Sequence, residues 1–171
     1  AWTRELIEKM RTKVPGAVLR TTMIVGHPGE GKRDFNELLD FVKDARFERL
    51  GAFKYSEEEG TYGAENLKDS ISAKVKQERL DELMTLQSEI SYEYNQSRVG
   101  SEVKVIVDDF TDGVYVCRSE FESPEVDGEI LVRHDSSVMG DIDPYSLVGE
   151  FITVRVTGAD EYDLIAEPIE I

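Results

Sequence analysis

Thiols and imidazoles are scarce in this sequence, which has one cysteine, Cys117, and two histidines among 171 residues. A single thiol excludes an internal disulfide and every metal or cluster site that needs several thiolates from this chain. Long apolar runs are also missing, because no stretch approaches the ~20 residues of a membrane span and the residues after Ala1 have neither the n-region nor the h-region of a signal peptide. We therefore expect a cytoplasmic protein without a membrane partner, and the missing initiator Met predicts that it was cut from a longer one.

Basic residues are in short supply in the second part of the chain. The whole sequence holds 36 acidic and 20 basic residues, a formal net charge of -16. Residues 1–100 account for 18 acidic and 16 basic side chains, whereas residues 101–171 hold 18 acidic and only four basic ones, a net of -14. A phosphate backbone needs clustered Lys and Arg, so this segment is not expected to bind nucleic acid. Acidic surfaces often serve solubility alone, but a charge of this size also attracts basic proteins.

Hydrophobic periodicity in the first hundred residues predicts alternating helices and strands. A helix is expected over 3–14, a strand over 17–25, a second helix around 35–42 and a second strand over 50–55. Strand, helix and strand at this spacing predict a right-handed parallel crossover. Both strands read as buried on two faces, which two helices alone cannot cover. We therefore expect the last part of a larger α/β barrel or sheet, completed by upstream sequence or by another chain.

The remaining residues predict a loop, a long helix and a small barrel. Residues 57–69 have no periodicity, and residues 72–99 have the apolar spacing of a helix that Gly100 ends. From residue 101 the period changes to two, with Asp112-Gly113 as a hairpin signal. Five short strands in about 70 residues indicate a closed all-β barrel of the oligonucleotide-binding type or a near relative. These strands are expected at 103–107, 114–118, 130–132, 151–156 and 162–166.

A glycine pattern between the first strand and the second helix raises a nucleotide-binding alternative. Gly26, Gly31 and Lys32 have the spacing of a phosphate-binding loop. The next position should be Ser or Thr to hold magnesium but is Arg33, and Pro28 removes a backbone N–H from the loop. A nucleotide hydrolase therefore stays open only as a disfavoured alternative.

Other chemistry-bearing residues favour structural roles. The two histidines lie in different segments, without a partner at metal-binding spacing. Cys117 falls in a predicted strand and is expected to be a core side chain of the barrel. Tyr115, Phe121 and Phe151 could form a stacking platform for bases, but that mode needs a cationic groove. A stand-alone nucleic-acid-binding barrel is therefore a second alternative, which the charge disfavours.

Several separated motifs resemble the family of radical S-adenosylmethionine methylthiotransferases. Residues 19–30 read LRTTMIVGHPGE, residues 51–61 read GAFKYSEEEGT, and a helix with Arg79 and Leu83 that closes in Val99-Gly100 fits the same family. The segment after this helix is similar to the TRAM barrel of these enzymes, so the resemblance covers the whole chain. It implies the C-terminal part of a TIM-like radical SAM barrel over 1–70, a long helix packing on that barrel over 71–100, and a TRAM domain over 101–171.

Within this family the chain is similar to the branch that methylthiolates an aspartate of the twelfth protein of the small ribosomal subunit. The tRNA-modifying relatives typically carry an Arg-Pro pair where this sequence has Glu58 and Glu59. The charge of the final segment points the same way, because ribosomal proteins are strongly basic and an acidic barrel suits them better than tRNA. A basic small-subunit ribosomal protein is thus the expected partner, bound by a monomer without direct tRNA contact. The tRNA-modifying branch remains the alternative.

The resemblance also implies cofactors that this chain cannot hold alone. Members of the family use S-adenosylmethionine and two [4Fe-4S] clusters, one of them held by a Cys-x3-Cys-x2-Cys loop and the other by an N-terminal domain. One cysteine cannot ligate either cluster. We therefore expect the cluster ligands outside this chain, the three-cysteine loop upstream of Ala1, and no activity from the chain by itself.

Candidate site residues follow from the same resemblance. Ile24 would pack against the adenine of S-adenosylmethionine, and Gly26 would let the backbone approach closely. Phe53 and Tyr55 would lie near the same ring. These residues stand at the ends of two strands, where barrel sites form, although Ile24 and Phe53 would also suit the core of any α/β barrel. His27 replaces a Phe usual in the family. No catalytic or metal-binding residue is expected.

Overall fold

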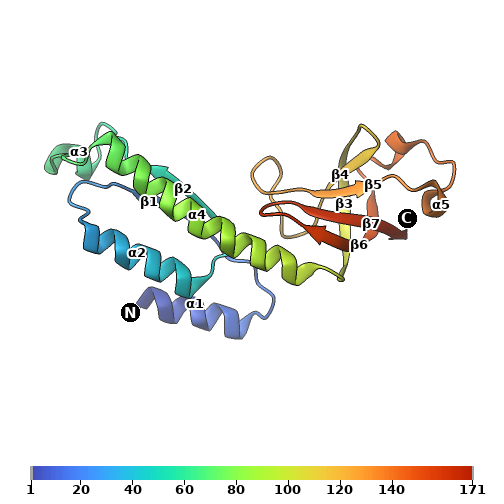
Figure 1. Ribbon diagram of the computed structural model, residues 1–171, viewed down its shortest axis with the longest axis horizontal. Helices are drawn as coiled ribbons and strands as arrows, with labels where there is room; N and C mark the ends of the chain where they lie inside the picture. The colour runs from blue at the N-terminus through green and yellow to red at the C-terminus, as the bar shows by residue number, and fades with distance from the viewer. Residues whose placement is uncertain (1, 171) are drawn as a thin grey trace. The chain divides into compact units, whose positions relative to one another are not determined.

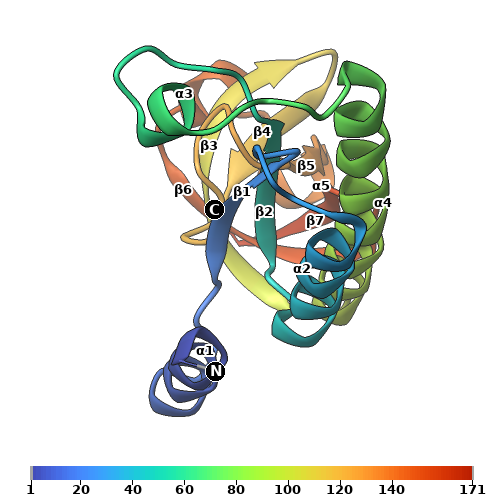
Figure 2. The same ribbon diagram turned by 90° about the vertical axis from the view of Figure 1, so that its left-hand side faces the viewer.

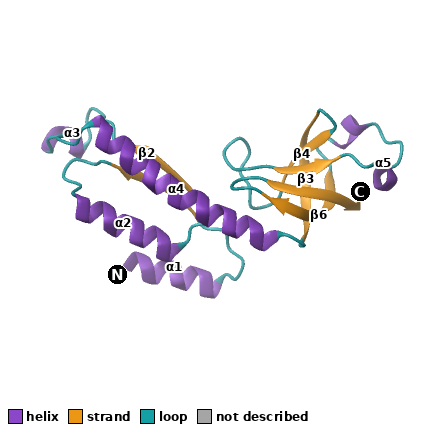
Figure 3. Ribbon diagram, in the orientation of Figure 1, coloured by secondary structure: helices purple, strands orange, loops and turns teal. Residues whose placement is uncertain are grey.

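The computed structural model describes residues 2–170, which fall into two units that divide between Ile90 and Ser91 (Figure 1). The division lies inside the longest helix, α4 (Ala73–Arg98). Figure 3 distinguishes a first unit that combines helices with two strands from a second unit that is mostly strand. None of the helices in this described range is long and apolar enough to cross a membrane.

The first unit is built around two parallel strands. β1 (Arg20–Val25) pairs with β2 (Arg49–Lys54) in a register that places Ile24 beside Phe53. The predicted parallel crossover is confirmed, since a parallel pair needs a connection that carries the chain back to the starting end, and its right-handedness stays a prediction. Helices α2 and α4 both lie on one side of the pair (Figure 2). The helices of this unit are α1 (Trp2–Lys13), α2 (Lys32–Ala45), α3 (Tyr62–Asn66) and the first part of α4.

One face of this two-stranded sheet is covered and the other is open. Val25 is fully buried in a cluster with Leu39 of α2 and Leu83 of α4. On the opposite face Ile24 and Phe53 are 56% and 64% exposed. The open face agrees with the expectation that two helices alone cannot cover both faces, and burial of this face by upstream sequence or another chain stays a prediction. Successive strand residues face opposite sides, and the helices of this unit cover only one of them.

The prediction of an unstructured loop over 57–69 is wrong in one part, because the chain forms the short helix α3 there. Thr61 begins this helix by accepting a hydrogen bond from the backbone N–H three residues further on, at 3.3 Å. Gly63 is buried, and a Cβ at this position would lie 2.7 Å from the hydroxyl of Tyr55. A helix of five residues is too short to show an apolar period, so the sequence pattern could not reveal it.

The second unit contains a closed barrel of five strands, as predicted. The strands follow the order β3-β4-β5-β7-β6 around the barrel, and all neighbours are antiparallel except β5 and β7. Asp112 and Gly113 join β3 to β4 with φ angles of 51° and 80°, the left-handed backbone that a tight hairpin requires. The strands are β3 (Glu102–Thr111), β4 (Val114–Arg118), β5 (Ile130–Arg133), β6 (Phe151–Ala159) and β7 (Leu164–Glu170).

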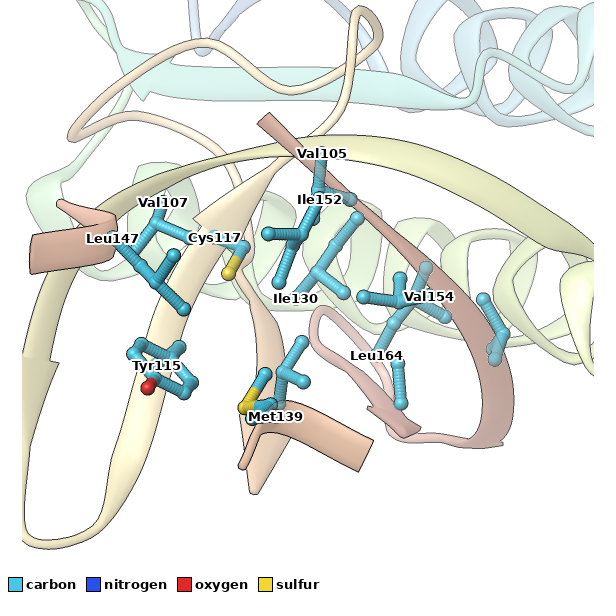
Figure 4. Close-up of a cluster of buried hydrophobic side chains, with 13 residues drawn as sticks. Val105, Val107, Tyr115, Cys117, Ile130, Met139, Leu147, Ile152, Val154 and Leu164 are labelled. Atoms are coloured by element: carbon cyan, nitrogen blue, oxygen red, sulfur yellow. The ribbon is translucent and has the colours of Figure 1, made fainter. Parts of the chain in front are cut away.

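Alternate strand residues point into the barrel and form a single core (Figure 4). Tyr115 and Cys117 of β4 are both almost fully buried there. The core position expected for Cys117 is confirmed, whereas Tyr115 cannot belong to a surface platform for bases. Two short helical segments, α5 (Ser136–Met139) and η1 (Pro144–Leu147), add Met139 and Leu147 to the same core.

The last turns of α4 belong to the barrel unit. The side-chain amide of Asn95 donates to two backbone carbonyls in the β6–β7 turn, at 3.2 and 3.3 Å. Arg98 forms an ion pair of 2.6 Å with Glu122, and both side chains are buried. Burial alone would raise the pKa of Glu122, but hydrogen bonds from Ser119 and the charge of Arg98 hold it below its ordinary value.

Candidate cofactor pocket and acidic barrel surface

A pocket of about 520 Å³ lies where β1 and β2 end. Ile24 and Phe53 stand side by side in its wall, and Tyr55 comes next, with its backbone N–H donating to the Val25 carbonyl at 2.8 Å. The structure thus brings together three of the four predicted site residues, at the strand ends where barrel sites form. The remaining lining residues are Thr22, His27, Lys54, Ser56, Glu58, Thr61 and Gly63.

The pocket combines apolar walls with a polar rim. The ring of His27 meets that of Tyr55 edge-on, with 5.0 Å between the centroids. At the rim, Ser56 donates its hydroxyl to Glu58 at 3.0 Å. Flat rings with polar edges suit such a site, since the ring packs on apolar side chains while its edges reach hydroxyl and carboxylate oxygens. An adenine has this chemistry, so the residues present fit the adenine part of S-adenosylmethionine.

Gly26, the fourth predicted site residue, is absent from the lining of this pocket. Its φ of +74° favours glycine, and a Cβ there would lie 2.5 Å from Cγ of Lys76. The buried Lys76 donates to the Tyr55 carbonyl at 3.1 Å and pairs with Asp69 at 2.5 Å. Its hydrogen bond lowers the pKa of Asp69. The close approach at Gly26 is therefore made by a lysine of α4, which also fixes the backbone of Tyr55.

A carboxylate that the sequence analysis missed holds the loop between β1 and α2. Glu30 accepts the Gly26 N–H with its two oxygens, at 3.0 and 3.1 Å. Arg79 of α4 donates to the Glu30 carboxylate at 2.6 Å, and both side chains are only 12% exposed. A phosphate-binding loop would present that N–H to its ligand, so this geometry counts against the nucleotide hydrolase. No local pattern could reveal the pair, because 49 residues separate its members.

The described residues do not fit an iron–sulfur cluster. Among residues 2–170 no group of three or more His, Cys, Asp or Glu side chains is arranged to hold a metal ion. Burial raises the pKa of Cys117 to about 12, so this thiol stays protonated at neutral pH. A protonated thiol inside a barrel core is neither a ligand nor a nucleophile.

A second pocket, of about 440 Å³, opens on the barrel between β3, β4 and the loop after β4. Arg118 in its lining already pairs with Asp108 at 2.9 Å. Elsewhere on the barrel, Lys104 lies 4.7 Å from the Phe151 ring centroid and Arg155 pairs with a carboxylate of β3 at 2.8 Å. Three of the four basic residues in the barrel strands therefore have partners within the barrel. The acidic lining residues are Asp108, Asp109, Glu125, Asp127 and Glu129.

Comparison with known families defines the class of the chain. Residues 99–169 match the TRAM domain, which accounts for the closed barrel. The fold is thus that of a TRAM-domain protein with a long helix and α/β elements ahead of the barrel.

Similarity to individual proteins extends over nearly the whole chain. It is 54% identical over 166 residues to the ribosomal protein uS12 methylthiotransferase RimO of Phocaeicola vulgatus, covering 97% of the chain and 37% of that protein. The protein of the same name from Porphyromonas gingivalis is 51% identical over 99% of the chain and 38% of its own length. That from Caldanaerobacter subterraneus is 45% identical over 95% and 35%. Over nearly its whole length the chain is therefore similar to RimO proteins, and it spans little more than a third of the length of these relatives.

Proposed function

We propose that the chain is the C-terminal part of a radical SAM methylthiotransferase that modifies an aspartate of ribosomal protein uS12 in the cytoplasm. The observation that carries the proposal is 54% identity, over 97% of the chain, with a protein named for action on uS12. Because the chain spans 37% of that relative, the other parts of such an enzyme would lie outside it. In this proposal residues 1–70 complete the radical SAM barrel, residues 71–100 form the helix packing on it, and residues 101–171 form the TRAM domain.

The open sheet face supports a role as one wall of the cofactor site. S-adenosylmethionine supplies the radical chemistry and the methyl group in this family when it is bound. Ile24 and Phe53 would pack against its adenine, and Tyr55 would flank the ring from a backbone position that Lys76 fixes. Gly26 would act indirectly, by leaving room for Lys76. The clusters would be held by residues outside this chain, so the chain alone should be inactive.

The acidic barrel supports a role in docking the protein substrate. Its net charge of -14 over residues 101–171 attracts a cationic polypeptide and repels a phosphate backbone. The carboxylate-lined pocket on the barrel offers oxygen acceptors for Lys or Arg side chains. A barrel of this charge favours the ribosomal protein over tRNA as the bound partner.

A chimera of the Phocaeicola vulgatus relative tests this function. Replacing its matching 37% with this chain should give an enzyme that methylthiolates uS12, detected by mass spectrometry of the modified aspartate. In the chimera, Phe53→Asp should lower the rate at least about tenfold, because a carboxylate in the wall disfavours the adenine ring. Ile165→Asp is the matched control, since Ile165 is also an exposed apolar strand residue but lies on the barrel.

Two outcomes of the chimera experiment would contradict the proposal. A chimera that folds and carries its clusters, yet leaves uS12 unmodified, would remove the assigned activity. Modification of tRNA in place of uS12 would assign the chain to the tRNA-modifying branch. The unfused 171-residue chain serves as the inactive reference in both assays.

A further inference from the structure

The segment between β5 and β6 closes one end of the barrel as a fixed plug. Met139 at the end of α5 and Leu147 at the end of η1 are 2% and 6% exposed and belong to the barrel core. Asp135 begins α5 by accepting the Ser137 N–H at 2.8 Å. One side of this segment is therefore anchored in the core, so its other side is presented to solvent in a defined arrangement.

Apolar side chains are exposed on this segment among polar and acidic ones. We define the end patch as the four exposed apolar side chains of the segment together with the ring of Phe110. The Tyr145 ring meets that of Phe110 edge-on, with 5.4 Å between centroids and an 87° angle. Scattered exposed apolar residues are normal on protein surfaces, but several from one short anchored segment mark an interaction surface. The end patch consists of Phe110, Val138, Ile142, Tyr145 and Val148, of which the last four are 39% to 65% exposed.

The segment that carries most of the end patch is acidic, although Arg133 at the end of β5 adjoins it. The segment 134–148 contains Asp135, Asp141 and Asp143 but neither Lys nor Arg. Asp143 accepts the backbone N–H of Tyr145 at 3.1 Å, so its carboxylate is held at the start of η1. Hydrogen bonds from Ser137 lower the pKa of Asp135, which keeps this carboxylate ionised at neutral pH. An aromatic face among ionised carboxylates attracts cations both through the ring and through the charges.

We propose that the end patch is the docking surface for a cationic segment of a polypeptide, which lays Lys or Arg side chains on Tyr145 and the neighbouring carboxylates while an apolar side chain covers the valines. This inference rests on the proposed function and narrows the substrate-docking role of the barrel to one end of it. A second copy of the chain fits less well, because it would bring another net charge of -16 to the same surface. Nucleic acid is disfavoured for the same reason.

Binding of purified uS12 to the 171-residue chain tests the end patch. Fluorescence anisotropy at several salt concentrations should show binding that weakens steeply as salt rises. Tyr145→Ala and Asp141→Lys should each weaken binding about tenfold, as expected for a central anchor and for a reversed charge. The matched controls are Tyr162→Ala and Glu161→Lys, two exposed positions in the β6–β7 turn of the same unit, which should leave binding unchanged.

The possible results separate this inference from the function on which it rests. If the parent chain does not bind uS12 at any salt concentration, the docking role of the barrel fails and the end patch with it. If binding persists in both end-patch variants but is lost in Glu129→Lys at the carboxylate-lined pocket, docking stands and the end patch is overturned. Self-association that Tyr145→Ala abolishes in sedimentation would identify a second copy as the occupant and would also overturn the inference. Circular dichroism spectra equal to the parent's confirm folding, and Asp141→Lys lies on the surface outside both helical caps.

Discussion

For the single residue Gly26, the sequence correctly predicts a close approach to the backbone but does not show which side chain approaches. A glycine at the end of a strand predicts a close approach, and the structure has one. The approaching group is the aliphatic part of Lys76, which lies 50 positions further along the chain. The lysine could not be predicted. Helical periodicity indicates which face of α4 is buried, but it does not indicate which residues of that face lie opposite the end of β1.

Gly26→Ala should destabilise the first unit by about 1–3 kcal/mol, through a strained left-handed backbone and a displaced Lys76. Gly29→Ala is the matched control, because Gly29 also has a positive φ of +92° but nothing within 4 Å of the added Cβ. Urea unfolding followed by circular dichroism should therefore place the Gly26 variant below the Gly29 variant in free energy of unfolding. Equal losses would mean that backbone strain alone matters and that Lys76 moves aside freely.

Some helices and strands could be predicted from the sequence and others could not. The helix α4 and the β3–β4 hairpin were predictable, since a long apolar period and an Asp-Gly pair are strong local signals. The short helix α3 carries no such period, and its place depends on Gly63 packing against Tyr55. Apolar residues on both faces of β1 and β2 indicated that two helices alone could not cover the pair, but they did not show which face those helices cover.

Glu122→Gln should show how much the buried ion pair between α4 and the loop after β4 contributes to the free energy of unfolding. Removing the carboxylate leaves Arg98 buried without its counter-charge, which costs about 3–5 kcal/mol at neutral pH. The folded-state pKa of Glu122 is lowered, so its stabilisation is present above the ordinary value near 4.5 and is lost as pH falls through the folded value. The difference between parent and variant in urea unfolding should therefore shrink below pH 4.5.

The control for this prediction is Glu102→Gln, which removes an exposed partner of Arg155. Exposed pairs contribute about 0–1 kcal/mol, so this variant should unfold close to the parent at every pH. A loss from Glu122→Gln no larger than that of the control would show that Arg98 finds water or another acceptor when the carboxylate is gone.

For the whole molecule, charge and fold class could be predicted from composition and pattern. Composition alone separates a nearly neutral first part from a strongly acidic second part at Gly100. The pairing of Ile24 with Phe53 also follows from sequence, because a parallel crossover brings consecutive strand ends together. The structure instead divides inside α4, since the polar contacts of its last turns are made to the barrel unit. Those contacts depend on tertiary packing, which a pattern of apolar residues does not record.

The last turns of α4 should accordingly be needed for a stable barrel, although the TRAM match begins only at residue 99. A fragment of residues 91–171 keeps the Asn95 hydrogen bonds and the ion pair of Arg98 with Glu122, whereas residues 101–171 keep Glu122 without its cation. We expect the shorter fragment to unfold at clearly lower urea concentration, by about 3–5 kcal/mol in free energy. Glu122→Gln should then cost clearly less in the shorter fragment, where the hydrogen bonds from Ser119 remain but the charge of Arg98 is gone. An equal cost in both fragments would mean that Glu122 is not buried against Arg98 in solution.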